Sequence, residues 1–219
     1  MKRRTLGGLL AAFLATTLLG AWPLAHAADE APDAMIRRLS DEVMNDIKSD
    51  PALHSGDINK VMALVDRKVM PNVNFARMTA SAVGPAWRQA TPDQRKRLQD
   101  EFKTLLVRTY SGALSQVNDQ QVIVKPVRME AGDTDVVVRS EIRGHGDPIQ
   151  LEYRLEKTPG QGAGWRIYNL NVLGVWLVET YRSQFAQEIN AKGIDGLIAS
   201  LAERNRANAA GNGAQAKKG

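Results

Sequence analysis

Residues 165–201 read WRIYNLNVLGVWLVETYRSQFAQEINAKGIDGLIASL. Residues 165–172 have the composition of a strand, and the almost wholly apolar segment 173–178 connects them directly to a helix that begins near Trp176. The stretch contains no cluster of nucleophiles, general bases or metal ligands. Such apolar surface without catalytic groups predicts the binding of an apolar molecule more readily than an enzyme.

A sheet is predicted directly before this stretch. In residues 149–155 apolar and polar side chains alternate, which is the period of a strand with one buried face. Residues 121–128 and 136–142 show a similar pattern. The connections between these segments are too short for a parallel crossover, which needs a dozen or more residues. We therefore expect about four antiparallel strands over residues 121–173.

Helices are predicted before and after the strands in the sequence. Residues 91–94, TPDQ, form a capping box with proline in the first turn, and a long helix follows to about Val117. Shorter amphipathic helices precede it, so that the helical part covers about residues 33–118. After the sheet we expect two helices, over residues 176–192 and 194–205. Helices and strands in separate runs are typical of the α+β class.

The long helix is predicted to be amphipathic. Apolar residues recur on it with the 3.6-residue helical period, so one side must be covered by another part of the fold. This apolar face comprises Leu98, Phe102, Leu105, Leu106, Tyr110, Ala113 and Leu114. We expect Arg95, Lys96, Asp100 and Lys103 to face water.

The N-terminus has the three parts of a secretory signal peptide. Three basic residues precede an uncharged run that ends in Ala25-His26-Ala27, a small-residue cleavage site. We predict that residues 1–27 are removed and that the mature protein is free in the periplasm. One domain is expected over residues 28–206, followed by a tail, 207–219, too polar and small to pack and therefore disordered.

Composition excludes several classes of function. The 29 Lys and Arg residues exceed the 24 Asp and Glu residues by only five, without the clustered basic excess of a nucleic-acid binder. The chain has no cysteine, so disulfides and thiolate metal sites are impossible. Only His54 and His145 remain after cleavage, fewer than the three or four ligands of a zinc site. We predict no metal, no cofactor and no nucleic-acid partner.

Acid–base catalysis is not expected either. Glu141, Glu152 and Glu156 alternate with the apolar strand positions, so their carboxylates are expected to face solvent. Tyr110 and Tyr153 are the hydroxyl-bearing residues among apolar neighbours, and they are more typical of core tyrosines than of general acids. We therefore predict that the protein is not an enzyme.

Two parts of the opening stretch resemble the C-terminal signature of the MlaC (toluene-tolerance) family of periplasmic phospholipid shuttles. They are GVWLVETYRSQF at 174–185 and GIDGLI at 193–198. The blocks WRQATPDQR at 87–95 and LEYRL at 151–155 resemble the family's long helix and paired strands. The chain departs from the family at Trp176, where serine is frequent. The resemblance implies an NTF2-like cone of about four antiparallel strands covered by a long helix, with additional N- and C-terminal helices.

The resemblance also implies a function. A member of this family would bind the acyl chains of a phospholipid in an apolar pocket, as a monomer. It would carry lipid between an outer-membrane lipoprotein complex and the substrate-binding subunit of an inner-membrane ABC transporter, which maintains the lipid asymmetry of the outer membrane.

The pocket is expected between the apolar sheet face and the long helix. Its walls are expected to comprise Met70, Val73, Phe75, Met78, Phe102, Leu105, Leu106, Tyr110, Val138, Ile142, Leu151, Tyr153, Ile167, Val172, Val175 and Trp176. Arg182 is a possible contact for the lipid headgroup, because arginine suits phosphate.

Periodicity alone also allows these residues to form an ordinary closed core. Two other functions therefore stay open. One is an NTF2-like enzyme that acts on a small apolar substrate, and the other is a periplasmic adaptor that binds protein without a ligand pocket.

Overall fold

The computed structural model of the protein describes residues 30–112, 117, 119–144 and 146–216. The predicted signal peptide of residues 1–27 and residues 113–116 of the predicted long helix lie outside the described residues. None of the helices in these described ranges is long and apolar enough to cross a membrane.

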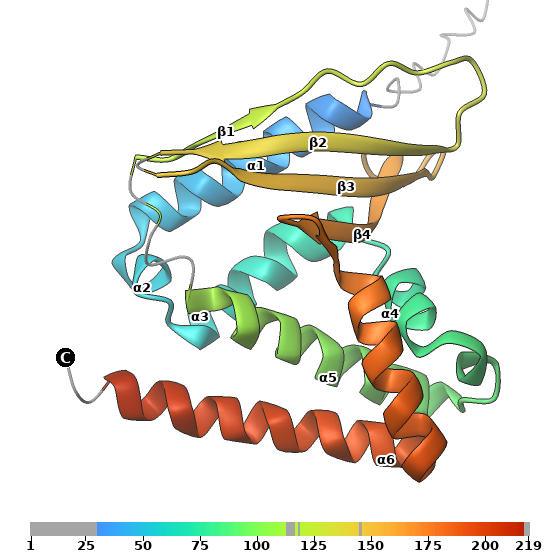
Figure 1. Ribbon diagram of the computed structural model, residues 1–219. Helices are drawn as coiled ribbons and strands as arrows, with labels where there is room; N and C mark the ends of the chain where they lie inside the picture. Colours follow the sequence, from blue (N-terminus) through green and yellow to red (C-terminus); the bar gives the residue numbers. More distant parts are fainter. Residues whose placement is uncertain (1–29, 113–116, 118, 145, 217–219) are drawn as a thin grey trace, which may run out of the picture.

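The described chain begins with helices, continues as a run of strands and ends in a long bent helix (Figure 1). In chain order the elements are α1 (Pro32–Ser49), α2 (Pro51–His54), α3 (Ile58–Leu64), the π-helical segment η1 (Val65–Val69), η2 (Met70–Asn72), α4 (Phe75–Val83), η3 (Gly84–Arg88), α5 (Pro92–Tyr110), β1 (Gln121–Val124), β2 (Asp135–Arg143), β3 (Ile149–Lys157), β4 (Trp165–Val172), β5 (Val175–Trp176) and α6 (Leu177–Ala216). This arrangement confirms the predicted α+β class.

The strands form one antiparallel sheet in the order β1-β2-β3-β4-β5, which is the predicted meander with a short fifth strand added. Across β2 and β3, Val138 lies opposite Tyr153, and Leu155 lies two residues along on the same face. Helix α1 packs on this inner face, as Figure 1 shows, and buries Met35 and Ile36 against Val138 and Leu155. Helix α1 therefore covers β1 and β2, α4 and α6 contact β4, and α5 lies farther from the sheet.

The first four residues of the apolar segment 173–178 form a tight hairpin with β4, and not the direct strand-to-helix connection expected from the sequence. Only Leu173 and Gly174 join β4 to β5, and their φ angles are 52° and 87°. Positive φ at both positions is the geometry of a type I′ turn, whose twist matches that of paired strands. Leu173 is held at the tip of this hairpin, where 63% of its surface is exposed. Trp176 belongs to β5, so the predicted start of the helix at this residue is wrong by one position.

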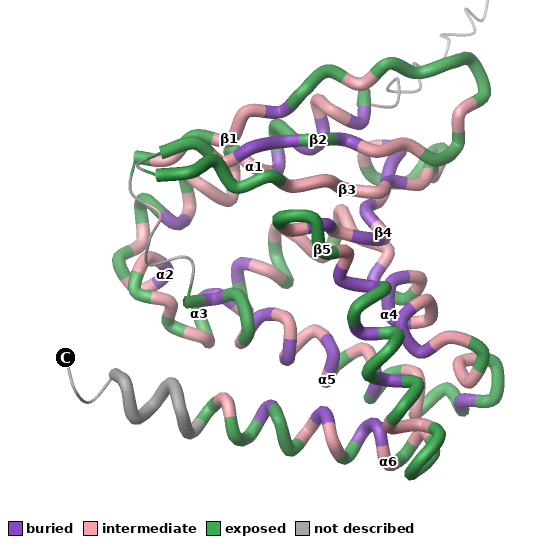
Figure 2. The backbone as a smooth tube through the Cα atoms, in the orientation of Figure 1, coloured by how far each residue is buried: buried purple, intermediate pink, exposed green. Residues whose placement is uncertain are grey.

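Helices α4, α5 and α6 form a second layer with a core of its own. Phe102 is fully buried in this core, and its ring centroid lies 4.9 Å from that of Tyr181 and 5.2 Å from that of Phe185. Figure 2 shows buried stretches along all three helices. The described residues thus form one apolar cluster beneath the sheet, a second among α4, α5 and α6, and a third where α1, α2, α3 and α5 meet.

The ends of the long helices partly follow the sequence prediction. Helix α5 begins with the predicted capping box between Thr91 and Gln94, but it ends at Tyr110, before the expected Val117. Helix α6 is interrupted at Gly193, where two separate helices are predicted. It then continues to Ala216, through residues that the sequence predicts to be a disordered tail.

Candidate functional site

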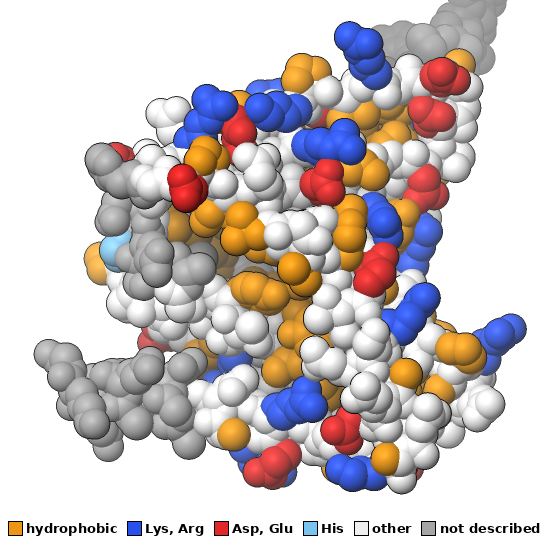
Figure 3. Space-filling view, in the orientation of Figure 1, with side chains coloured by type: hydrophobic (Ala, Val, Ile, Leu, Met, Phe, Trp, Pro, Cys, Tyr) orange, Lys and Arg blue, Asp and Glu red, His pale blue; other side chains and the backbone are white. Residues whose placement is uncertain are grey.

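A cavity of about 390 Å³ lies between the inner face of the sheet and α5. Its walls come from α1, the α3–η1 segment, η2, α4, α5, the neighbouring strands β3 and β4, and the first residue of α6. They comprise Ile36, Leu39, Ser40, Val43, Ile47, Val61, Leu64, Val65, Val69, Met70, Val73, Phe75, Met78, Lys103, Leu106, Val107, Tyr110, Ser111, Tyr153, Ile167, Leu170, Val172 and Leu177. In Figure 3 apolar side chains gather around a hollow between the sheet and the helices below it.

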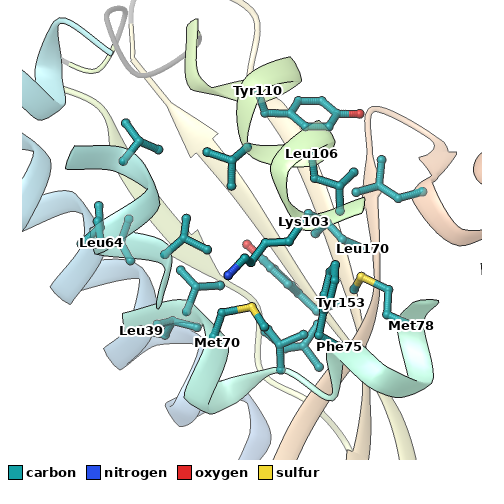
Figure 4. Close-up of a pocket in the computed structure, with 18 of the residues that line it drawn as sticks. Leu39, Leu64, Met70, Phe75, Met78, Lys103, Leu106, Tyr110, Tyr153 and Leu170 are labelled. Atoms are coloured by element: carbon teal, nitrogen blue, oxygen red, sulfur yellow. The ribbon is translucent and has the colours of Figure 1, made fainter. Parts of the chain in front are cut away.

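The cavity wall is almost entirely aliphatic and aromatic (Figure 4). Tyr153 presents its ring, while its hydroxyl accepts a hydrogen bond from Ser140 Oγ over 3.4 Å. Burial raises the pKa of Tyr153 above its ordinary value, and burial also raises the pKa of Tyr110. Both phenols therefore stay neutral at physiological pH, so they add no charge to the wall.

An empty cavity of this kind would be costly. Left unfilled, the cavity deprives the apolar side chains of its wall of packing contacts, and the loss of such contacts lowers the stability of a folded protein. Water is a poor occupant because apolar walls offer it few hydrogen-bond partners. The geometry therefore favours an apolar occupant, and the volume lies in the usual range of ligand pockets, ~300 to 1,000 Å³.

More than half of the residues predicted to line a pocket lie on this cavity wall. They are Met70, Val73, Phe75, Met78, Leu106, Tyr110, Tyr153, Ile167 and Val172. These residues come from η2, α4, α5, β3 and β4, so the fold brings together segments that are distant in the sequence.

The other predicted lining residues lie elsewhere. Phe102 and Leu105 are buried in the core among the helices, and Val138 is fully buried beneath α1. Two more, Ile142 and Leu151, lie on β2 and β3 but are not part of the cavity wall. All five lie on the apolar side of their helix or strand. The periodicity of apolar residues identifies this side, but it does not show whether a residue there packs against other side chains or lines a cavity.

The hairpin removes the last two predicted lining residues from the cavity. Val175 is more than half exposed on β5. The ring of Trp176 lies 4.0 Å from the guanidinium of Arg154, in a cation–π contact on the outer side of the sheet. The tight turn reverses the chain immediately after Val172, the last cavity residue of β4.

Arg182 does not line the cavity. Its Nε donates a hydrogen bond of 2.8 Å to the carbonyl oxygen of Ser81, which joins α6 to α4. It lies beside a shallow surface depression that also includes Arg77 and Arg88. This hydrogen bond is a structural contact between two helices, and Arg182 is not among the residues of the cavity wall.

Sequence reasoning missed the wall formed by the first helices. Ile36, Leu39, Val43 and Ile47 of α1 line the cavity, and so do Val61, Leu64, Val65 and Val69 of the α3–η1 segment. The apolar stripes of these helices are visible in the sequence, but a stripe does not indicate which layer of the fold it faces. Lys103 was expected on the water-facing side of α5, yet it lies on the cavity wall.

The described residues hold no group of three or more His, Cys, Asp or Glu side chains that could bind a metal. His54 ends α2, and His145 lies outside the described residues. The expectation that Glu141 faces solvent is wrong, since only 6% of its surface is exposed. It lies on the outer face of the sheet, where Lys125 and Arg143 cover it and pair with its carboxylate.

Most of the chain is similar in sequence to known proteins. The family model described as MlaC protein matches residues 37–203. The toluene tolerance protein ttg2D of Pseudomonas putida is 27% identical over 197 residues, which cover 87% of this chain and 90% of that protein. The intermembrane phospholipid transport system binding protein MlaC of Haemophilus influenzae is 24% identical over 177 residues, which cover 80% and 82% of the two chains.

A solved structure has a similar fold. It is the phospholipid-binding protein from Ralstonia solanacearum in complex with a phospholipid, with 47% sequence identity and a TM-score of 0.76. The similarity covers 81% of this chain and 98% of that one. The matched family region includes every residue of the cavity wall except Ile36. With the family model matching most of its length, the chain belongs to the MlaC family.

Proposed function

We propose that the protein is a periplasmic carrier that binds a phospholipid by its acyl chains in the cavity. The observation that carries this proposal is the apolar cavity of about 390 Å³ between the sheet and α5. The Ralstonia solanacearum protein, 47% identical and similar in fold, holds a phospholipid, which supports the same class of ligand here.

A carrier of this kind lowers the free-energy barrier to moving a lipid through water. Transfer of one methylene group from an apolar environment into water costs ~0.8 kcal/mol of free energy. A lipid with ~30 methylenes that enters water alone would therefore have to overcome on the order of 24 kcal/mol. An apolar cavity that encloses the chains lowers this barrier without making or breaking a bond. The function is therefore passive transport, and the protein is not an enzyme.

The proposed route connects two membranes. An outer-membrane lipoprotein complex and the substrate-binding subunit of an inner-membrane ABC transporter are the proposed partners, and the transfer would maintain outer-membrane lipid asymmetry. The name of the Haemophilus influenzae relative, a binding protein of an intermembrane phospholipid transport system, supports this route. The signal peptide predicted over residues 1–27 supports the periplasmic location.

Native mass spectrometry of the protein purified from its own host tests the proposal. The expected result is a mass increment of one or more phospholipids, which is lost after extraction with organic solvent. A protein that carries no lipid and binds none from vesicles would contradict the carrier function. That outcome would favour the small-substrate enzyme or the protein-binding adaptor.

A further inference from the structure

Among the described residues of the cavity wall, Lys103 is the one that carries a full charge. It shares the cavity side of α5 with Leu106, Val107 and Tyr110, at the three- and four-residue spacing of one helical face. Figure 4 shows its side chain extending from α5 toward the side of the cavity where Leu64 and Met70 lie. An apolar residue would be ordinary at this position, so the charge requires an explanation.

The ammonium group of Lys103 is paired across the cavity rim. Its Nζ lies 2.7 Å from Oδ1 of Asp66, which belongs to η1, the segment that also gives Val65 and Val69 to the wall. The Lys103 side chain is 23% exposed and that of Asp66 is 49% exposed. A side chain that lines the cavity and also reaches solvent lies where the two meet.

The ion pair lies where the phosphate of a bound lipid is expected. Acyl chains in the cavity leave the phosphate at the rim, because burying an unpaired anion among apolar side chains is strongly unfavourable. An ammonium carries three donors, so Lys103 has hydrogen-bonding capacity beyond Asp66. Lysine binds phosphate as a point charge, and such charge-assisted hydrogen bonds are among the stronger ones in proteins.

We propose that Lys103 binds the phosphate of the lipid at the rim of the cavity, and that Asp66 is the counter-ion that holds Lys103 in place when the cavity is empty. This proposal rests on the proposed carrier function, and it assigns to Lys103 the headgroup role that the sequence suggested for Arg182. The competing anion of Asp66 weakens the hold of Lys103 on the phosphate, so the two residues act in opposite directions.

The test compares Lys103→Met, which keeps the length and apolar stem of the side chain, with Lys96→Met. Lys96 is the matched control because it also lies on α5 and pairs with an aspartate, Asp100, but outside the cavity. Binding is measured for phosphatidylglycerol and for diacylglycerol with the same acyl chains. Lys103→Met is expected to weaken phosphatidylglycerol binding by about tenfold or more and to leave diacylglycerol binding unchanged. Lys96→Met is expected to change neither.

The second pair of variants tests the opposing role of Asp66. Asp66→Asn is expected to tighten phosphatidylglycerol binding several-fold, while Asp100→Asn leaves it unchanged. The ³¹P resonance of bound phosphatidylglycerol gives an independent readout, since Lys103→Met should shift it and Lys96→Met should not. Should Lys103→Met fail to fold, Lys103→Gln replaces it in both measurements.

Each adverse outcome has its own meaning. If the unmodified protein binds neither lipid, the carrier function itself fails. If it binds both and Lys103→Met alters neither, the Lys103 proposal fails and the carrier function stands. Equal losses for both lipids would mean that Lys103 only shapes the wall. Inorganic phosphate that binds as tightly as phosphatidylglycerol would mean a site for free anions, and it would also overturn the proposal.

Discussion

Leu106 and Phe102 lie one turn apart on α5, yet their side chains have different surroundings. Leu106 lines the cavity, whereas Phe102 is fully enclosed by the rings of Phe75, Tyr181 and Phe185. A cavity wall can hydrate once its occupant leaves, but a closed core has no room for water. The two residues therefore give opposite expectations for the same kind of substitution.

Leu106→Gln is expected to displace the bound lipid while the protein still unfolds cooperatively. Phe102→Ala is the contrasting variant, and it should lower the free energy of unfolding by about 3 to 5 kcal/mol because it leaves a hole in a packed core. Lipid extraction and thermal unfolding are measured on both. Ile167 is a less clean site because it lines the cavity and also packs in the core beneath the sheet. If Leu106→Gln no longer folds and the unmodified protein is never found with bound lipid, the expectation that Leu106 lines a lipid cavity is refuted.

Glu141 should make the stability of the protein depend on acid pH. A hydrogen bond from Lys125, then one from Gln150 and the charge of Arg143 hold the pKa of this carboxyl below its ordinary value. The stabilisation is thus fully present above the unfolded-state pKa, about 4.3, and it is lost as the pH falls through the lower folded-state pKa. Urea unfolding of Glu141→Gln should show lower stability at pH 7 and a shallower decline below about pH 4.3. Glu203→Gln, in an exposed pair with Arg206, serves as the control and should leave the profile unchanged.

At the scale of the elements, the helical and strand periods predict most of the fold. They give the α+β class, the meander and the break in the last helix, since each depends on local sequence alone. They fail at the hairpin of Leu173 and Gly174, because leucine is an unusual residue at positive φ and the apolar segment reads as continuous. They also fail to distinguish core from cavity, because Phe102 and Leu106 share one apolar face of α5. Their environments differ because residues of α4 and α6 enclose Phe102, whereas Leu106 lines the cavity.

The bend in α6 depends on one residue. Gly193 has φ 71° and ψ −174°, a region that is essentially restricted to glycine. A Cβ placed there meets no atom within 4 Å, so any cost of Gly193→Ala is conformational and not steric. We expect it to lower the free energy of unfolding by roughly 1 to 3 kcal/mol. Gln187→Ala, at an exposed position of the same helix, should change it little. Equal denaturation midpoints for the two variants would contradict the conformational argument.

At the scale of the whole molecule, the cargo is expected to contribute to stability. A ligand that binds only the folded state adds ~2.7 kcal/mol at a hundredfold excess over its Kd. For a chain of this size, each kcal/mol shifts Tm by roughly 2 to 4 °C, so extraction of the lipid should lower Tm by about 5 to 10 °C. Scanning calorimetry before extraction, after it and after lipid is restored measures the difference. An unchanged Tm would mean that the cavity is closed by its own side chains.

The apolar wall of the cavity also has a consequence for heat capacity. Loading covers the wall and the acyl chains together, and burial of apolar surface on binding gives a negative change in heat capacity. The binding enthalpy must then become more exothermic as the temperature rises, while the accompanying entropy becomes less favourable and offsets it. Because the changes in enthalpy and entropy nearly cancel in the binding free energy, the affinity for the lipid varies little with temperature. The protein is thus expected to bind a lipid with similar affinity at low and high temperature.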